Sequence, residues 1–332
     1  MTEQELSLIA FTDRGAELME RLRQQLGGEA LCSRCQPDFS LAEWTARRFP
    51  HRQALIFVGA VGIAVRAVAP HIKSKAQDPA VVVVDEAGRF VIPLLSGHLG
   101  GANALAAEVA RICGGTPVIT TATDINRRFA VDLWAKRQGL CLTDTRGIKL
   151  VSGKLLAGNT VSVCSRWPVA GDPPPGVVFT DDPLADVIVD VYGSAGSGLQ
   201  LVPVCCTLGV GCRRGTAAEA LERAFSRFCA ERDLRAESIR GAASIDLKQD
   251  EAGLLEFCRS HGWEPAFFTA AELAAVPGSF TPSAFVAQTV GVDNVCERSA
   301  VAAGGALLEA KYAADGVTLA VACDPPQLDW SW

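Results

Sequence analysis

Short apolar runs that end in glycine-containing turns and lead into helical patterns recur along this chain, and this alternation constrains the fold most strongly. The apolar run at residues 54–58 passes through Gly59 and Gly62 into a helical segment. Residues 80–95 hold two further apolar runs, and Asp85–Gly88 joins them in a pattern typical of a β-hairpin. Strands that alternate with helices predict α/β domains whose sheets are mainly parallel.

The length of 332 residues predicts a multi-domain chain, because a domain typically holds about 100–200 residues. We expect an N-terminal α/β domain over residues 1–135, a small middle α/β module with its linker over 136–200, and a C-terminal α/β domain over 201–332. Two features mark the middle segment: a proline-rich stretch, "GDPPPG", and a flexible composition, "GSAGSG", at residues 193–198.

The composition excludes several classes of protein. Hydrophobic residues make up 49% of the chain and charged residues 20%, which is enough for buried cores and argues against disorder. The formal net charge is −6 and no basic tail is present, so we predict no nucleic-acid partner. No run of about 18 apolar residues occurs, which predicts no membrane span. The first residues lack the basic and long apolar regions of a signal peptide, so we expect a cytoplasmic protein.

Twelve cysteines are scattered along the chain, mostly in apolar runs. In a cytoplasmic protein we expect them to be reduced and to pack as small hydrophobic side chains. Cys32 and Cys35 have the C-x-x-C spacing of a metal or redox site, but no second such pair and no H-x3-H completes four zinc ligands. We therefore predict no metal site.

Three glycine-rich loops follow predicted strands and open predicted helices. Unpaired N–H groups and the helix dipole make such a position an anion site, and glycine lets a ligand approach the backbone closely. The alternative for each loop is an ordinary strand-to-helix turn. The G-x-G-x-x-x-G spacing of the third loop does not match a nucleotide fingerprint. The candidate residues are Gly59, Gly62 and Arg66 in the first loop, Ser96, Gly97, His98, Gly100, Gly101 and Asn103 in the second, and Gly209, Gly211, Arg213 and Arg214 in the third.

Acid–base candidates lie in the second loop and in "ASIDLKQDE". His98 stands among glycines, where its ring would face solvent or a ligand and act as an acid or base, or as an axial metal ligand. A structural role is the alternative for a single histidine. A strand that ends at Lys248 would place Asp246 and Lys248 on one face. The acids that follow, Asp250 and Glu251, fit the start of a helix equally well.

The polar run "GVDNVCERSA" precedes a helix that we expect over residues 300–310. Asn294 and Arg298 in this run are candidate binding residues, and helix capping is the alternative. Cys296 as a nucleophile would need a histidine that only the fold could bring close.

Together these stretches resemble the cobalt-precorrin-5A hydrolase family of the anaerobic, early-cobalt route to cobalamin. The resemblance covers nearly the whole chain and keeps the family's order. It implies an N-terminal domain, a less distinctive middle and a C-terminal domain. The matching pieces are "GAVGIAVRAVAPHIKSKAQDPAVVVVDEAGRFVIPLLSGHLGGANALA", "LGVGCRRGT", "ASIDLKQDE", "FTPSAFV" and "VGVDNVCERSA".

The resemblance also implies a reaction. The substrate would be a cobalt-containing tetrapyrrole with a δ-lactone formed by the ring A acetate. Hydrolysis of this lactone, followed by loss of acetaldehyde, would give cobalt-precorrin-5B. Cobalt would arrive with the substrate, so the resemblance implies no cofactor bound by the protein itself. The product would pass to the next methyltransferase of the pathway.

We assign the residues hypothetical roles in this reaction. His98 would be the base, N–H groups around Gly100 and Gly101 would hold the oxyanion, and Arg213 and Arg214 would bind peripheral carboxylates. Asp246 and Lys248 are further candidates for proton transfer. A non-catalytic carrier of the corrinoid intermediate is the alternative function. A tetrapyrrole methyltransferase would need an S-adenosylmethionine site, which the loops do not clearly form.

Overall fold

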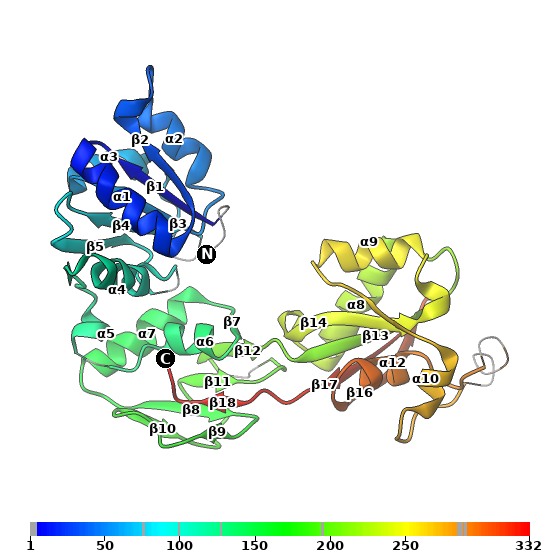
Figure 1. The fold of residues 1–332 in the computed structure, drawn as a ribbon. Helices are drawn as coiled ribbons and strands as arrows, with labels where there is room; N and C mark the ends of the chain where they lie inside the picture. The colour runs from blue at the N-terminus through cyan, green and yellow to red at the C-terminus, as the bar shows by residue number, and fades with distance from the viewer. Residues whose placement is uncertain are drawn as a thin grey trace. The chain divides into compact units, whose positions relative to one another are not determined.

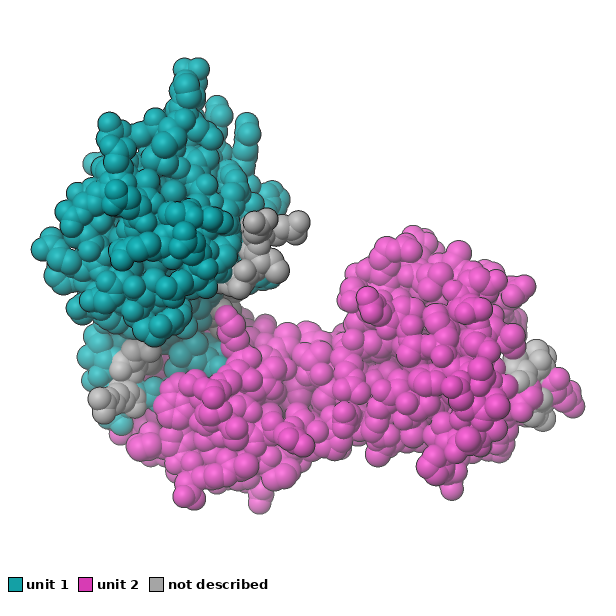
Figure 2. Space-filling view, viewed as in Figure 1, with its two compact units in different colours: residues 1–133 teal, residues 134–332 magenta. Residues whose placement is uncertain are grey.

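A computed structural model of the chain describes residues 5–74, 77–98, 100–126, 128–193, 196–283, 288 and 291–332 (Figure 1). Residues 194 and 195 of the predicted linker, and residues 284–286 of "FTPSAFV", lie outside this set. The chain divides into two compact units, residues 1–133 and 134–332 (Figure 2). Among the described residues, no helix combines the length and the apolar character that crossing a membrane requires.

The first unit contains a six-stranded sheet with the order β2-β1-β3-β4-β5-β6. All neighbouring strands are parallel except β4 and β5, which are antiparallel. The prediction of a mainly parallel α/β sheet is therefore confirmed here. The strands are β1 (Leu6–Ala10), β2 (Glu29–Cys32), β3 (Ala54–Val58), β4 (Ala80–Val84), β5 (Phe90–Leu95) and β6 (Thr116–Pro117).

Helices cover both faces of this sheet because successive residues of each buried strand point to opposite sides. Ile56 packs in the core beneath α1 and α4, whereas its neighbours Leu55 and Phe57 pack in the core beneath α2 and α3. The helices of this unit are α1 (Asp13–Leu26), α2 (Leu41–Arg48), α3 (Val61–Val68), α4 (Ala102–Cys113) and α5 (Ala122–Ile125), with short 3₁₀ helices at Ser33–Cys35 and Ala69–His71.

The hairpin between β4 and β5 forms at the predicted turn. Asp85 accepts hydrogen bonds from the N–H groups of Ala87 (2.9 Å) and Phe90 (2.6 Å), and Gly88 has a φ of 71°. Such a φ suits glycine, which has no Cβ to clash. The chain therefore reverses direction, and β5 ends at the edge of the sheet where β4 begins.

The second unit begins with helix α6 (Val131–Arg137), which spans its boundary, and contains a sheet with the order β10-β8-β11-β12-β7. The strands are parallel except β7, which is antiparallel to β12. Helix α7 (Thr145–Leu156) packs against β8 and β12. The strands are β7 (Leu140–Leu142), β8 (Val161–Ser165), β10 (Val177–Phe179), β11 (Val187–Val189) and β12 (Leu199–Pro203).

The end of the chain forms a two-stranded sheet with a strand of the middle segment. Strand β18 (Leu328–Asp329) pairs with β9 (Val169–Ala170). The ring of Trp330 stacks on that of Trp134 at 5.4 Å between centroids. Trp134 also donates its indole N–H to Asp329 O (2.6 Å). The last residues thus pack with the segment around residue 134.

The second sheet of this unit has the order β15-β14-β13-β17-β16. Helices α8 and α9 pack in the hydrophobic core on one face of the sheet, while α12 contacts β13, β14 and β17. The strands are β13 (Cys206–Cys212), β14 (Ile239–Ile245), β15 (Ala266–Phe268), β16 (Ala306–Ala314) and β17 (Val317–Cys323). The helices are α8 (Ala218–Arg232), α9 (Ala252–Ser260), α10 (Ala270–Ala275) and α12 (Cys296–Ala303), with 3₁₀ helices at Ala236–Ser238 and Asp246–Lys248.

Two local predictions in this sheet are wrong. The strand of "ASIDLKQDE" ends at Ile245, and Asp246–Lys248 form a 3₁₀ turn, so Asp246 and Lys248 do not share a strand face. The helix expected over 300–310 begins at Cys296 and ends at Ala303, and strand β16 follows. Pairing with β17 along the whole of β16 overrides the helical preference of its alanines.

The third glycine-rich loop is also displaced. Gly209 and Gly211 lie inside β13 rather than in a loop, and the turn itself spans residues 213–216. A Cβ at Gly209 would lie 1.8 Å from Cys296 O, so glycine there lets α12 approach the sheet. The prediction that Gly209 contacts a ligand in a loop is therefore wrong.

Gly209→Ala should lower the free energy of unfolding by about 3 kcal/mol or more, because the backbone of α12 must move to admit the methyl group. Gly153→Ala is the control, since a Cβ there meets nothing within 4 Å on the exposed side of α7. It should be neutral or stabilise by up to about 1 kcal/mol. Urea denaturation measures both, and equal effects would contradict this account of Gly209.

Candidate active site

The loop of residues 96–101 carries His98 from β5 into α4. Ser96 has a φ of 56° and Gly101 a φ of 86°, so the chain turns sharply at both ends of the loop. The Ser96 hydroxyl donates to Asp78 O (2.9 Å), which fixes the first turn against the start of β4. A Cβ at Gly100 would lie 2.3 Å from Ser96 Cβ, so only glycine fits there.

The N–H groups at the start of α4 already donate hydrogen bonds within this loop, which corrects the predicted role of one of them as an oxyanion donor. The prediction that N–H groups around Gly100 and Gly101 hold an oxyanion is wrong for Gly101, because its N–H is used by the turn. Three N–H groups donate to carbonyl oxygens of the loop itself: Gly101 to His98 (2.9 Å), Ala102 to Ser96 (3.1 Å) and Asn103 to Gly97 (2.9 Å).

The side chain of His98 is held by a buried carboxylate. His98 Nδ1 lies 3.2 Å from Asp132 Oδ2, and the two side chains are 13% and 10% exposed. The other carboxylate oxygen accepts the N–H of Leu133 (3.1 Å). A carboxylate in this position orients an imidazole and stabilises its protonated form, which is the arrangement that general bases use.

The first glycine-rich loop does not belong to this site. Strands β3 and β4 are parallel, so Gly59 lies beside Val84, to whose carbonyl oxygen it donates at 2.8 Å. The His98 loop follows β5 and lies near Ala80, at the other end of β4. The two ends are four residues apart, or roughly 13 Å. Gly59, Gly62 and Arg66 therefore lie at the opposite edge of the sheet, contrary to the prediction that they bind the same ligand.

The second unit holds a pocket of about 700 Å³ where the parallel strands β13 and β14 end. Open α/β sheets bind ligands at the carboxyl ends of their strands. Among the predicted residues, Gly211, Arg213, Arg214, Lys248 and Asn294 line this pocket. Asp246 does not line it.

Cationic side chains outnumber acidic ones around the pocket. Arg213, Arg214, Lys248 and Lys311 line it, against a single carboxylate, Asp315. Within the described part of the chain, no salt bridge involves Arg213 or Lys311. Positive charges that no protein carboxylate neutralises attract anionic ligands and can pair with carboxylates directly.

Lys248 is tied to the turn that carries the arginines. Its ammonium group lies 3.2 Å from Glu251 Oε2, and the two side chains are 15% and 7% exposed. Glu251 also accepts the N–H of Gly215 (2.6 Å). Glu251 is the N-cap residue of α9, but its side chain holds the turn of residues 213–216 instead of capping the helix.

Asn294 and Glu297 build a buried network behind the pocket. Asn294 Oδ1 accepts the N–H of Glu297 (2.8 Å), which caps α12 as the alternative reading of "GVDNVCERSA" predicts. Its amide group donates to Thr281 O (2.8 Å) and to Glu297 Oε2 (2.7 Å). Asn294 thus supports the pocket wall with its polar atoms used inside the protein, contrary to the prediction that it binds substrate directly.

Arg298 is likewise held by the protein. Its guanidinium group pairs with Asp293 (2.9 Å) and donates to the carbonyl oxygens of Leu273 and Val276 at 3.1 and 3.2 Å. It also lies over the ring of Phe280, 4.6 Å from the centroid. These contacts contradict its prediction as a binding residue.

Cys296 is not a suitable nucleophile. Burial raises the pKa of its thiol to about 11, so the protonated form predominates at neutral pH. The thiolate is the reactive form of cysteine. This removes the alternative that Cys296 attacks a substrate.

Comparison with known proteins places these features in a family. Residues 43–124 match the model "Cobalamin synthesis G N-terminal", and residues 206–322 match "Cobalamin synthesis G C-terminus". A protein of Salmonella typhimurium named cobalt-precorrin-5A hydrolase is 33% identical over 95% of this chain and 96% of its own. The chain belongs to the cobalt-precorrin-5A hydrolase family. The family predicted from the sequence is therefore confirmed.

The chain is also similar to two further proteins. The protein of that name from Priestia megaterium is 33% identical over 83% of this chain and 80% of its own. A solved structure of a cobalamin biosynthesis protein G homolog from Sulfolobus solfataricus is 23% identical and covers 97% of this chain and 98% of its own. Its TM-score is 0.39.

The sequence alone did not indicate two residues of the candidate sites, Asp132 and Lys311. Asp132 lies 34 positions from His98, outside the matched N-terminal segment, and only the fold pairs them. Lys311 lies one residue beyond the helix expected over 300–310, and nothing in the sequence indicated its position beside the pocket. The turn at Asp315 and Gly316 between β16 and β17 was the signal that could have placed Lys311 on a strand of a hairpin.

Glu297→Gln should lower the free energy of unfolding by at least about 2 kcal/mol. Each carboxylate oxygen accepts two hydrogen bonds, from the Thr281 N–H and Asn294 on one side and from the Thr281 hydroxyl and the Lys311 N–H on the other. An amide group would face two donors in either orientation.

Glu272→Gln is the matched control, because Glu272 accepts from the N–H and hydroxyl of Thr269 in the same way but at an exposed site. Its loss should stay below about 1 kcal/mol. Thermal and urea unfolding of both variants test the difference. A fully stable Glu297→Gln protein would contradict a supporting role for the network.

Proposed function

We propose that this protein hydrolyses the ring A δ-lactone of cobalt-precorrin-5A and releases acetaldehyde, giving cobalt-precorrin-5B. The observation that carries the proposal is the buried His98–Asp132 pair, which supplies an oriented base in a glycine-rich loop. The names of relatives that are 33% identical over most of this chain support the same reaction. Cobalt arrives with the substrate, and the proposed chemistry uses no metal held by the protein.

In the first step, His98 accepts a proton from water as the water oxygen adds to the lactone carbonyl. The tetrahedral intermediate then collapses to the ring A carboxylate, and the departing C20 oxygen takes the proton back from the imidazolium. Asp132 keeps the ring oriented and stabilises its charged state between these transfers.

In the second step, the same base removes the proton of the freed C20 hydroxyl. The C20 carbon and its methyl group leave as acetaldehyde when the carbon–carbon bond breaks, and the bonding electron pair passes into the macrocycle. One base therefore serves both proton transfers. The product then passes to the next methyltransferase of the route.

The cationic pocket of the second unit suits the peripheral carboxylates of a tetrapyrrole. Arg213 and Lys311 lack carboxylate partners among the described residues, so their charges are available to acetate and propionate groups. Substrate binding and proton transfer then depend on different residues, so substitutions in the pocket should change KM and substitutions of the base should change kcat.

His98→Ala should lower the rate of acetaldehyde release by about 10²–10⁴-fold, the contribution typical of a general base. Asp132→Asn should lower kcat with little change in KM, because it disturbs the orientation of His98 rather than substrate binding. Acetaldehyde from purified cobalt-precorrin-5A is followed with coupled alcohol dehydrogenase.

His51→Ala is the control for these variants, since His51 is an exposed histidine of the same unit. It should release acetaldehyde at the wild-type rate. Release by His98→Ala at that rate would return His98 to a structural role. Tight substrate binding without release by the wild type would favour the corrinoid carrier.

Arg213→Gln and Lys311→Gln should each raise KM about five-fold with little change in kcat, which corresponds to about 1 kcal/mol for one charge contact in water. Arg66→Gln is the matched control, because Arg66 is exposed and lies at the sheet edge opposite to His98. Steady-state kinetics at two salt concentrations measure the effect. An equal rise in KM for Arg66→Gln would argue against the pocket as the carboxylate site.

A further inference from the structure

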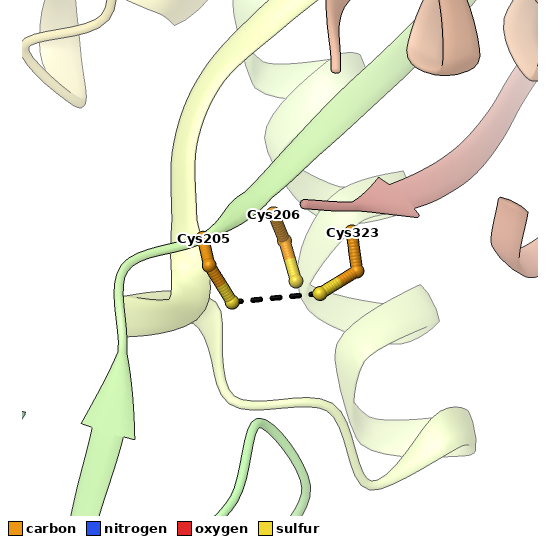
Figure 3. A group of neighbouring side chains, drawn as sticks. All are labelled: Cys205, Cys206 and Cys323. Carbon is orange, nitrogen blue, oxygen red and sulfur yellow. Dashed lines mark hydrogen bonds between the residues drawn. The ribbon is translucent and has the colours of Figure 1, made fainter. Parts of the chain in front are cut away.

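Three buried cysteines meet in the second unit although they are distant in sequence (Figure 3). Cys205 precedes β13, Cys206 is its first residue, and Cys323 is the last residue of β17. Cys206 and Cys323 are register partners on these antiparallel strands. Cys205 Sγ lies 3.5 Å from Cys323 Sγ, and all three sulfur atoms lie within 4.8 Å of one another.

These separations suit three sulfur atoms that share one metal ion. Thiolate sulfur binds zinc at about 2.3 Å, so two sulfurs on the same ion lie about 3.8–4.0 Å apart. The side chains are 5%, 0% and 6% exposed, and Figure 3 shows their sulfur atoms turned toward one another. Small rotations of side chains that already converge would complete the coordination.

A positive charge lies beside the cluster. Arg240 contacts the Thr207 hydroxyl (3.4 Å) and Asp324 (3.5 Å), the residues that follow Cys206 and Cys323 in the sequence. Its guanidinium group can balance part of the negative charge that thiolate ligands bring.

The donors select the class of metal. Within the described residues, this group of potential ligands contains sulfur alone, and the three cysteines belong to a hydrophobic core that also includes Val191, Leu234 and Ile239. Sulfur ligands in an apolar setting favour soft or borderline ions, whereas Mg²⁺ and Ca²⁺ require oxygen ligands.

We propose that Cys205, Cys206 and Cys323 form a site for one thiophilic metal ion, Zn²⁺ or Cu⁺, bound through three sulfurs. Each thiol that binds loses its proton to solvent, and no electron is transferred. The site lies where the chain passes from β12 to β13 and where it leaves β17 toward β18. A bound ion would therefore hold together the two chain connections at this end of the C-terminal sheet. This site is separate from the proposed hydrolysis and does not depend on it.

The sequence predicted no metal site because Cys205 and Cys323 are 118 positions apart and therefore form no short motif. Spacing rules search for ligands in short motifs, and the pair that they single out, Cys32 and Cys35, offers two thiols with Cys35 exposed. The fold therefore indicates a candidate metal site at cysteines that were predicted from the sequence to be buried core residues.

The test uses the full-length protein, reduced and stripped of metal with a chelator. Zn²⁺ is titrated in competition with a chromophoric chelator, and Cu⁺ is titrated without oxygen in competition with bicinchoninate. We expect one tight equivalent for at least one of the two ions, and the arm that binds more tightly identifies the metal. Cys206→Ala and Cys323→Ala should each weaken binding on the order of 100-fold or more, since one of three ligands is lost.

Two matched controls separate the site from other cysteines. Cys258→Ala removes a buried cysteine outside the cluster, and Cys32→Ser/Cys35→Ser removes the C-x-x-C pair. Both should bind the ion as the wild type does. Binding that is lost only with Cys32 and Cys35 would overturn the proposal, as would the absence of a tight equivalent for both ions.

A second measurement needs no variant. X-ray absorption of the wild type loaded with one equivalent of metal should show three sulfur neighbours at about 2.3 Å. A shell of oxygen and nitrogen alone would overturn the proposal. Peptide mapping of the metal-loaded protein that found Cys205 and Cys323 joined in a disulfide would also overturn it, because those sulfurs could not then act as thiolate ligands.

Discussion

Strand β5 runs antiparallel to β4, and the position of the first candidate site follows from this reversal. Asp85 and Gly88 close the hairpin, so the loop after β5 lies near Ala80 and not beside Gly59. Had β5 been parallel to β4, its loop would have opened at the same sheet edge as the loop after β3. The hairpin instead gives His98 its own surroundings, where the start of α6 can supply Asp132.

The sequence was informative where local patterns are strong. The strand Ala54–Val58 and the hairpin turn agree with the structure because each depends on apolar periodicity or on the steric freedom of glycine. Strand β16 was missed because alanines favour a helix in isolation, and only the neighbouring strand β17 makes the extended form stable.

The candidate sites were less predictable because they depend on contacts between distant residues. His98 is visible in the sequence as a histidine among glycines, but its carboxylate partner is not. Arg298 and Asn294 have residue types typical of binding sites, yet their polar atoms are used to hold α12 and its surroundings. Residue type therefore indicated which segments matter, while the distinction between binding residues and supporting residues required the fold.

The buried carboxylates Glu297 and Glu251, beside the C-terminal sheet, both have hydrogen-bond or ion-pair partners. Glu297 accepts four hydrogen bonds and Glu251 pairs with Lys248, because an unpaired charge in the interior would be costly. These networks leave Arg213 and Lys311 at the pocket with their charges unpaired among the described residues. Rigid support behind exposed cations is the arrangement that allows a pocket to bind an anionic ligand without reorganising.

The pairing of the last residues with the middle segment has a consequence for biosynthesis. Strand β18 pairs with β9 in a two-stranded sheet, and Trp330 packs against Trp134, so these contacts form only when residues near both ends of this unit are present. On the ribosome, residues 206–323 emerge before Leu328 does, and the C-terminal sheet can fold before the β9–β18 pair forms. The β9–β18 pair is therefore among the last parts of the protein to become native during translation.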